Sequence, residues 1–269
     1  MGILKTVIGS YPCKYKDFGL EAIDRALKAQ LDADIDLVSD GQTRYSMIDY
    51  FAEAIDGVEV VGKRAVITSK IGEVSSETMV HDLEYVRRLI PEGREVKGIL
   101  TGPTTLAMSS KLDCYQSYLD RELYIDLAEA LRKIAMDLQS AGASSIQVDE
   151  PFISVGVPMD LTKEVIELIA EEIRVPLALH VCGEADWVIP ALFEFENVNI
   201  LSFASAVNRK NLSALDREKL ESWDKMVGIG CIDTASIEVE TAEEVCSVLQ
   251  EAERIIGREN MIAHPDCGL

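Results

Sequence analysis

The sequence predicts a parallel (β/α)8 barrel, because short apolar runs rich in β-branched residues alternate with helix-length amphipathic stretches. Most of the runs are apolar throughout, as expected for strands that are covered on both faces. The predicted strands are Lys5–Ser10, Ile35–Ser39, Gly98–Gly102, Ser145–Glu150, Leu177–Cys182, Asn199–Ala204, Met226–Ile232 and Met261–Cys267. The predicted helices are Phe18–Ala33, Thr78–Leu89, Tyr115–Ala141, Leu161–Ile173, Glu184–Phe193, Asn208–Glu221 and Thr241–Ile256. We expect one catalytic barrel domain over residues 1–269.

Two features depart from a regular barrel. The stretch 57–71 alternates around a turn at Gly62 and Lys63, which predicts a β-hairpin inserted after the second strand. The sequence also ends directly after the eighth predicted strand, so we expect the closing helix to be missing. Either the chain is truncated or another element covers that flank.

Composition and charge exclude several classes of function. A net charge of −21, with no cluster of Lys and Arg, opposes contact with a phosphate backbone, so no nucleic-acid partner is expected. No apolar run approaches the roughly 20 residues that cross a bilayer, and no signal peptide is present, so we expect no membrane partner and a cytoplasmic location. The six scattered cysteines are then expected to be reduced.

Three potential metal ligands follow the ends of predicted strands. His180 and Cys182 are two residues apart on a strand, so their side chains share a face, and Cys267 ends the last strand. Active sites of barrels lie where the carboxyl ends of the strands meet. One imidazole and two thiolates suit Zn(II) and leave a coordination position open. Each residue alone would more often be an ordinary core residue, but three at one mouth favour a metal site.

Asp149 and Glu150 are adjacent acids at the end of the fourth predicted strand. Because neighbours on a strand point to opposite faces, only one of them can face the barrel mouth. The residues alone leave open whether either does, since both could cap the following turn and helix.

Taken together, these residues resemble the catalytic barrel of the cobalamin-independent methionine synthase family, and the similarity runs over nearly the whole chain. The specific elements are His180-Val181-Cys182 and Pro265-Asp266-Cys267-Gly268-Leu269 in combination. Weaker matches are Ile8-Gly9-Ser10-Tyr11-Pro12, Met47-Ile48-Asp49-Tyr50-Phe51, Thr101-Gly102-Pro103 and Ala141-Gly142 followed by Ile146-Gln147-Val148-Asp149-Glu150-Pro151.

The resemblance implies roles for single residues. It assigns His180, Cys182 and Cys267 as zinc ligands, in agreement with their spacing. It also implies that Ile8, Ser10 and Asp149 hold the amino-acid part of homocysteine, and it selects Asp149 as the acid that faces the mouth. Asp40, at the end of the second predicted strand, is a further candidate for substrate binding.

The chain departs from the family pattern at three points. Ala204 stands where the family has a further zinc ligand, a Glu, so the fourth ligand would be Glu150, Asp40 or water. Asp233 occupies the catalytic position after the seventh strand at which folate-using members carry a His, thought to protonate the folate. The long amino-terminal half of those members is absent. The last two features resemble the short archaeal-type forms, which take methyl from a methylcorrinoid.

We therefore expect a zinc-dependent methyltransferase that makes methionine from homocysteine, with methylcobalamin or a methylcorrinoid, presented by a corrinoid protein, as the donor. A free thiol with a pKa of about 8.5 is mostly protonated at neutral pH, whereas zinc holds it as the nucleophilic thiolate. Aspartic acid, with a usual pKa of about 3.9, is a poor proton donor to folate, whereas a methyl–cobalt bond breaks without a proton. Two alternatives are alkyl transfer to another thiol such as coenzyme M, and an inactive barrel that binds a corrinoid or a partner.

Overall fold

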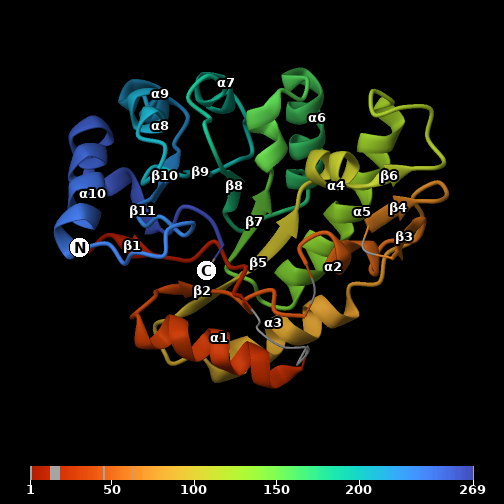
Figure 1. Cartoon of the computed structure of the whole chain (residues 1–269), viewed down its shortest axis with the longest axis horizontal. Helices are drawn as coiled ribbons and strands as arrows, with labels where there is room; N and C mark the ends of the chain where they lie inside the picture. The colour runs from red at the N-terminus through yellow and green to blue at the C-terminus, as the bar shows by residue number, and fades with distance from the viewer. Residues whose placement is uncertain (1, 13–18, 45, 63, 269) are drawn as a thin grey trace.

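The chain folds as a ring of parallel strands surrounded by helices, which confirms the predicted (β/α)8 barrel (Figure 1). The computed structural model describes residues 2–12, 19–44, 46–62 and 64–268. Phe18, Lys63 and Leu269, which belong to predicted elements or motifs, lie outside the described residues. The strands neighbour one another in the order β1-β11-β10-β9-β8-β7-β5-β2, and a parallel bridge from Thr6 to Leu37 joins the two ends of this sheet.

Each barrel strand overlaps a predicted run and most are shorter than predicted, but the first strand shares only Lys5 with its run and the third begins at Glu95 instead of Gly98. They are β1 (Leu4–Lys5), β2 (Leu37–Val38), β5 (Glu95–Thr101), β7 (Ser145–Asp149), β8 (Leu177–Val181), β9 (Ile200–Phe203), β10 (Met226–Gly230) and β11 (Met261–His264). The surrounding helices are α1 (Leu20–Asp32), α3 (Glu77–Leu89), α5 (Arg121–Ser140), α6 (Met159–Ala170), α7 (Ile189–Leu192), α8 (Lys210–Ser213), α9 (Arg217–Ser222) and α10 (Ala242–Ile256). Within the described part of the chain no helix follows β11. No described helix is both long and apolar enough to span a membrane.

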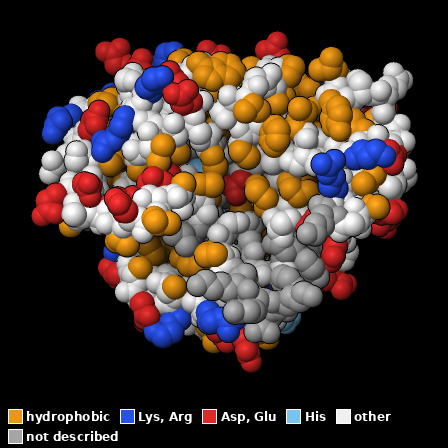
Figure 2. Space-filling view, in the orientation of Figure 1, with side chains coloured by type: hydrophobic (Ala, Val, Ile, Leu, Met, Phe, Trp, Pro, Cys, Tyr) orange, Lys and Arg blue, Asp and Glu red, His pale blue; other side chains and the backbone are white. Residues whose placement is uncertain are grey.

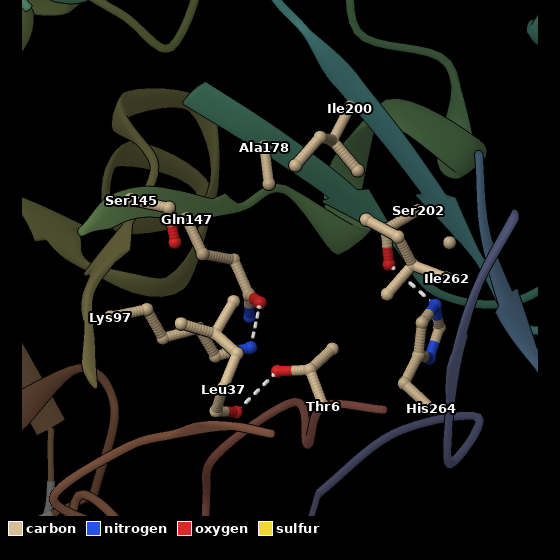
Figure 3. A pocket seen from close by; sticks show the side chains of 11 residues that line it. Thr6, Leu37, Lys97, Ser145, Gln147, Ala178, Ile200, Ser202, Ile262 and His264 are labelled. Carbon is tan, nitrogen blue, oxygen red and sulfur yellow. Dashed lines mark hydrogen bonds between the residues drawn. The ribbon is translucent and has the colours of Figure 1, made fainter. Parts of the chain in front are cut away.

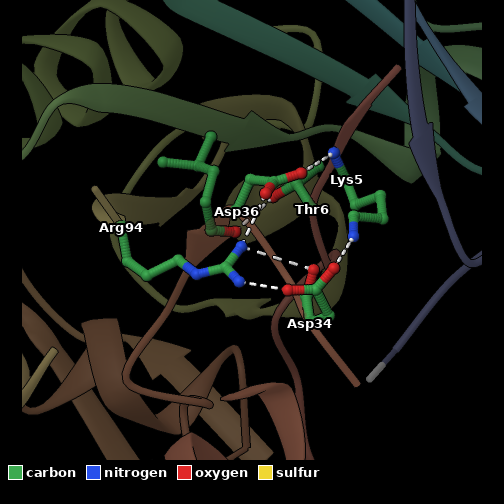
Figure 4. Close-up of polar contacts among 6 residues, drawn as sticks. Lys5, Thr6, Asp34, Asp36 and Arg94 are labelled. Carbon is green, nitrogen blue, oxygen red and sulfur yellow. Dashed lines mark hydrogen bonds and ion pairs between the residues drawn. The ribbon is translucent and has the colours of Figure 1, made fainter. Parts of the chain in front are cut away.

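Side chains complete the seam between β1 and β2, where the strands have only two residues each (Figure 4). The backbone N–H of Lys5 donates to the carboxylate of Asp36 at 2.9 Å, and the Thr6 hydroxyl donates to the carbonyl of Leu37 at 2.7 Å. Arg94 pairs with the same Asp36 carboxylate at 2.6 Å. The ring therefore closes through side-chain hydrogen bonds as well as through backbone pairing.

Alternation along the strands separates an apolar exterior from a polar interior. On β7 the side chains of Ile146 and Val148 are fully buried in the apolar layer beneath the helices. Their neighbours Ser145 and Gln147 point into the barrel, where they line a small cavity of about 20 Å³ together with Lys97 and others (Figure 3). Barrel interiors are usually filled by branched apolar side chains, so this polar interior is a specific feature of the molecule.

The predicted hairpin is present as an antiparallel pair, β3 (Val58–Val61) and β4 (Arg64–Ile67). A short third strand, β6 (Lys111–Leu112), pairs with β4 and was not predicted. The helices α2 (Asp49–Ala52) and α4 (Pro103–Ser109) were also not predicted, and neither were the short 3-10 helices Pro151–Val155 and Arg258–Asn260. All of these are too short for a helical or strand period to show in the sequence.

Two predicted helices begin or break where an aspartate caps the chain. Helix α5 was expected from Tyr115 but begins at Arg121, because the carboxylate of Asp120 accepts the backbone N–H of Glu122. The single helix expected over 208–221 is divided into α8 and α9, and the side chain of Asp216 caps the second. The exact helix starts thus depend on local capping and not on the apolar pattern.

Glu150 fixes the start of α4 beside the end of β7. Its buried carboxylate accepts the backbone N–H and hydroxyl groups of both Thr104 and Thr105, with backbone distances of 2.9 Å. A Cβ atom at Gly102 would lie 2.3 Å from this carboxyl group, so only glycine permits the approach. Burial raises the pKa of Glu150 to about 7, while these hydrogen bonds favour its ionised form.

Replacing Glu150 with alanine should destabilise the barrel, because buried donors on α4 would lose their acceptor. We expect Glu150→Ala to lower the free energy of unfolding by roughly 1–3 kcal/mol or more, the cost of leaving a buried polar group unpartnered. Urea unfolding followed by circular dichroism measures this. The control is Glu164→Ala, which removes the exposed partner of Arg121 and should cost no more than about 1 kcal/mol. Equal effects of the two changes would contradict the assigned role.

Candidate metal and substrate site

His180 and Cys182 approach one another at the carboxyl end of β8. The alternation that buries Leu179 and Val181 in the outer apolar layer turns His180 inward. The Nε2 atom of His180 lies 2.9 Å from the Sγ atom of Cys182, and the ring is only 1% exposed. The imidazole is therefore buried and in contact with the Cys182 thiol.

Cys267 completes a three-residue cluster. Its Sγ atom lies 3.4 Å from that of Cys182, and the ligand atoms of His180, Cys182 and Cys267 all lie within 4.8 Å of one another. The side chain of Cys267 is exposed, so the cluster is open to solvent on one side. The structure thus brings together the three residues that the sequence predicted as metal ligands.

The pKa values of the Cys182 and Cys267 thiols are shifted in opposite directions. The hydrogen bond from the Cys182 thiol, together with the nearby His180 imidazole, lowers the pKa of Cys267 and favours its thiolate form. The hydrogen bond to Cys267 and burial raise the pKa of Cys182, which keeps its proton while no cation is close. A soft divalent cation would replace that proton, so the donor set fits Zn(II).

Neither protein carboxylate considered as a fourth ligand joins the cluster. Glu150 faces α4, on the side of β7 away from the mouth, and its oxygens are already occupied by Thr104 and Thr105. Asp40 accepts the backbone N–H of Gln42 at 3.0 Å, and burial raises its pKa to about 6. Among the described residues, only His180, Cys182 and Cys267 form a possible metal group.

Ala204 follows the end of β9 and is 4% exposed, with no ligand atom to offer. The loop that begins there is tied to the last strand by Asp266. The carboxylate of Asp266 accepts the backbone N–H groups of Ser205, Ala206 and Val207 at 2.8–2.9 Å. Asp266, for which no role was predicted, therefore fixes the loop next to Cys267. The hydroxyl of Ser205, in this loop, is among the buried polar groups of the described residues that have no hydrogen-bond partner.

Asp149 lies at the end of β7 on the same face as Gln147. The Gln147 amide donates to the Asp149 carboxylate at 2.7 Å and to the carbonyl of Ile8 at 2.9 Å. Lys97 donates to the amide oxygen of Gln147 at 2.5 Å and to the carbonyl of Val7. One network thus joins Asp149 to the segment after β1.

Burial and the neighbouring charges shift the pKa values of Asp149 and Lys97 in opposite directions. Burial raises the pKa of Asp149, and the nearby His180 and Lys97 act in the opposite direction. Burial lowers the pKa of Lys97 to about 7, and Asp149 opposes that shift. Sequence reasoning missed Lys97 and Gln147, although a lysine in an apolar strand pattern is the kind of signal that marks an internal charge.

The remaining predicted site residues lie in two places. Ile8 is buried, and the hydroxyl of Ser10 donates to the amide oxygen of Gln42 at 3.2 Å. A Cβ atom at Gly268 would lie 3.6 Å from the carbonyl oxygen of Ser10, which places this segment beside the Cys267 loop. Asp233 follows β10, where its carboxylate accepts the backbone N–H of Ala235 at 2.8 Å and so stabilises a turn.

The face seen in Figure 1 has a depression near its middle, and apolar side chains gather beside it over α4 and α6 (Figure 2). Exposed apolar residues occur in several loops that follow barrel strands. They include Val155, Trp187, Val207, Ile237 and Val239.

Comparison with known proteins identifies the family. The family model described as "Cobalamin-independent synthase, Catalytic domain" matches residues 4–269. A methionine synthase of Methanothermobacter marburgensis is 36% identical over 292 residues, covering 99% of this chain and 93% of the relative. A methionine synthase of Methanocaldococcus jannaschii is 34% identical over 296 residues, covering 99% and 92%.

Solved structures show the same fold. A B12-independent methionine synthase from Shewanella sp. W3-18-1, in complex with selenomethionine, superposes with a TM-score of 0.83 at 24% identity, covering 100% of this chain and 91% of that one. A methyltransferase from Methanosarcina mazei superposes with a TM-score of 0.70 at 14% identity, covering 99% and 86%. The match of the family model over almost the whole chain, together with relatives above 30% identity, shows that this chain belongs to the cobalamin-independent methionine synthase family.

Proposed function

We propose that this chain transfers a methyl group to the sulfur of homocysteine, at a zinc ion held by His180, Cys182 and Cys267. The observation that carries the proposal is the convergence of their three ligand atoms within 4.8 Å at the barrel mouth. Methionine synthases among the relatives support the reaction. Because the site needs reduced thiols, the proposal places the enzyme in the cytoplasm.

Bound zinc would supply Lewis acidity that keeps the substrate thiol deprotonated near neutral pH. Three protein ligands leave one position of a tetrahedral ion for that thiol, as in catalytic zinc sites. The alanine at position 204 is compatible with this count, because a fourth protein ligand is not required. The exposed side of Cys267 gives substrate and methyl donor a common approach.

The polar network would bind the amino-acid end of homocysteine. An ionised Asp149 can accept hydrogen bonds from the substrate ammonium group, and Gln147 holds that carboxylate in place. The positive charge of Lys97 favours ionised Asp149 within the buried interior. Ser10 and the backbone around Ile8 lie on the segment that Gln147 fixes, so they are proposed to contact the same end of the substrate. A role for Asp40 in substrate binding stays a prediction.

We propose a methylcorrinoid, presented by a corrinoid protein, as the methyl donor. The family description "cobalamin-independent" favours a donor other than a corrinoid, so this proposal depends on Asp233. Removing methyl from a folate requires an acid for the departing nitrogen. The Asp233 carboxylate serves instead as the acceptor for the Ala235 N–H, whereas a methyl–cobalt bond needs no acid.

The zinc proposal predicts the metal content of the purified protein. We expect one zinc per chain, and His180→Ala or Cys182→Ser should reduce the content by at least tenfold, because each removes one of three ligands. Mass spectrometry of the metal after gel filtration measures this. Cys231→Ser is the control, since that buried thiol donates to the His264 carbonyl and lies outside the cluster. Full zinc content in His180→Ala would contradict the proposed set of ligands.

Asp149→Asn should weaken homocysteine binding while leaving the metal in place. The amide keeps the shape of the side chain but loses the charge that binds the ammonium group, so we expect KM for homocysteine to rise roughly tenfold to a hundredfold, in line with the value of a charge-assisted hydrogen bond. Steady-state kinetics and metal analysis on the same preparation test this. Loss of zinc with an unchanged KM would make Asp149 a metal ligand instead.

The donor proposal predicts turnover with methylcobalamin and little with methyltetrahydrofolate. Methionine formation from homocysteine should be measured with each donor separately, and with coenzyme M in place of homocysteine to test the other acceptor. Comparable rates with the folate would overturn the donor assignment and leave methyl transfer to homocysteine intact. An Asp233→Ala variant should retain the methylcobalamin reaction if its carboxylate only stabilises the turn.

A further inference from the structure

A chain of hydrogen bonds runs from His180 into the barrel interior. The Nδ1 atom of His180 lies 2.9 Å from the hydroxyl oxygen of Ser202. The same oxygen lies 2.9 Å from the Nε2 atom of His264, a contact shown in Figure 3. The Nδ1 atom of His264 lies 2.7 Å from the carbonyl oxygen of Pro265. The side chains of the three residues are almost completely buried, so no solvent competes for these bonds.

The contact between His264 and the carbonyl of Pro265 determines which atom donates and which accepts in each of these hydrogen bonds. A carbonyl oxygen only accepts, so the Nδ1 atom of His264 carries a proton. The residue is 3% exposed, and its hydrogen-bond partners among the described residues, the Ser202 hydroxyl and the Pro265 carbonyl, are uncharged, so the neutral ring is favoured and its Nε2 atom is an acceptor. The hydroxyl proton of Ser202 is therefore directed to His264, and its oxygen accepts from His180.

His180 then has its proton on Nδ1 and its lone pair on Nε2. That lone pair points to the two thiols, since Nε2 lies 2.9 Å from the Sγ atom of Cys182. With the opposite direction of donation, Nε2 would carry the proton and could not bind a metal. The direction of the hydrogen bonds through Ser202 thus decides whether Nε2 of His180 is free to act as a ligand.

We propose that Ser202 and His264 are positioning residues that fix the tautomer and ring orientation of His180 for metal binding. The inference rests on the proposed zinc site. Ligating histidines commonly donate to a carboxylate or a backbone carbonyl. A carboxylate here would add another buried negative charge next to two thiolates, whereas this neutral pair fixes the tautomer without one.

Strand β10 has a glycine beside the imidazole ring of His264. A Cβ atom at Gly228 would lie 2.7 Å from the Nε2 atom of His264, so β10 needs glycine at this point to admit the ring. The rings of His180 and His264 also contact edge to face, with centroids 5.9 Å apart. Both contacts hold His264 where Ser202 can reach it.

The first test reads the tautomers directly. The chain has three histidines, so long-range ¹H–¹⁵N NMR spectra of the ¹⁵N-histidine-labelled protein, zinc-loaded and metal-free, can resolve each ring. We expect His264 to be neutral with its proton on Nδ1 in both samples, and His180 to carry its proton on Nδ1. A proton on Nε2 of His264 would overturn the proposal. The metal-free spectrum gives this answer even if the protein proves not to bind zinc.

The second test measures zinc affinity by competition with a chromophoric chelator. Ser202→Ala should raise the dissociation constant for zinc roughly tenfold to a hundredfold, the usual cost of losing the partner of a ligating histidine. Ser145→Ala removes another hydroxyl that lines the same cavity, and it should leave the constant within about twofold. Ser202→Thr keeps the hydroxyl and should restore most of the affinity. Equal effects of Ser202→Ala and Ser145→Ala, or no effect of either, would contradict the assigned role.

Discussion

The polar groups buried inside the barrel need hydrogen-bond partners there, and these hydrogen bonds position the residues of the candidate site. Gln147 is the central residue, because its amide joins Lys97, the carbonyl of Ile8 and the carboxylate of Asp149. An unpartnered amide or ammonium group in this interior would cost several kcal/mol, on the order of 2–7 kcal/mol for a neutral polar group. The network therefore holds β5, β7 and the segment after β1 in one arrangement.

Two polar systems meet at the mouth of this barrel. One runs from Lys97 to Asp149 and presents a carboxylate, and the other runs from His264 to His180 and presents a lone pair. The first suits the ammonium group of an amino acid, and the second suits a metal ion. Under the proposed function, an amino-acid thiol that contacts both systems would have its sulfur oriented for methyl transfer.

The strand pattern of the sequence predicted the barrel, because the apolar runs are long enough to mark buried strands. The same alternation predicted that His180 and Cys182 share a face, and the structure confirms it. The cluster with Cys267 could be predicted because ligand atoms at strand ends meet at one mouth. The roles of Ile8, Ser10, Asp149 and Asp40 toward a substrate stay predictions.

Other features could not be predicted from a pattern. Helix α4 is short and depends on the buried carboxylate of Glu150, which belongs to a segment distant in sequence. The partnership of Ser202 with His180 and His264 joins three strands, and no local spacing reveals it. Asp266 lies inside a recognised motif, yet its bonds to the loop after β9 appear only in three dimensions.

We propose that His180, Cys182 and Cys267 hold a zinc ion with one position open for a thiol. X-ray absorption spectroscopy at the zinc edge, before and after addition of homocysteine, tests it most directly. The account predicts two sulfur and one nitrogen neighbour from the protein, and one more sulfur when homocysteine binds. An unchanged number of sulfur neighbours at saturating homocysteine would contradict it.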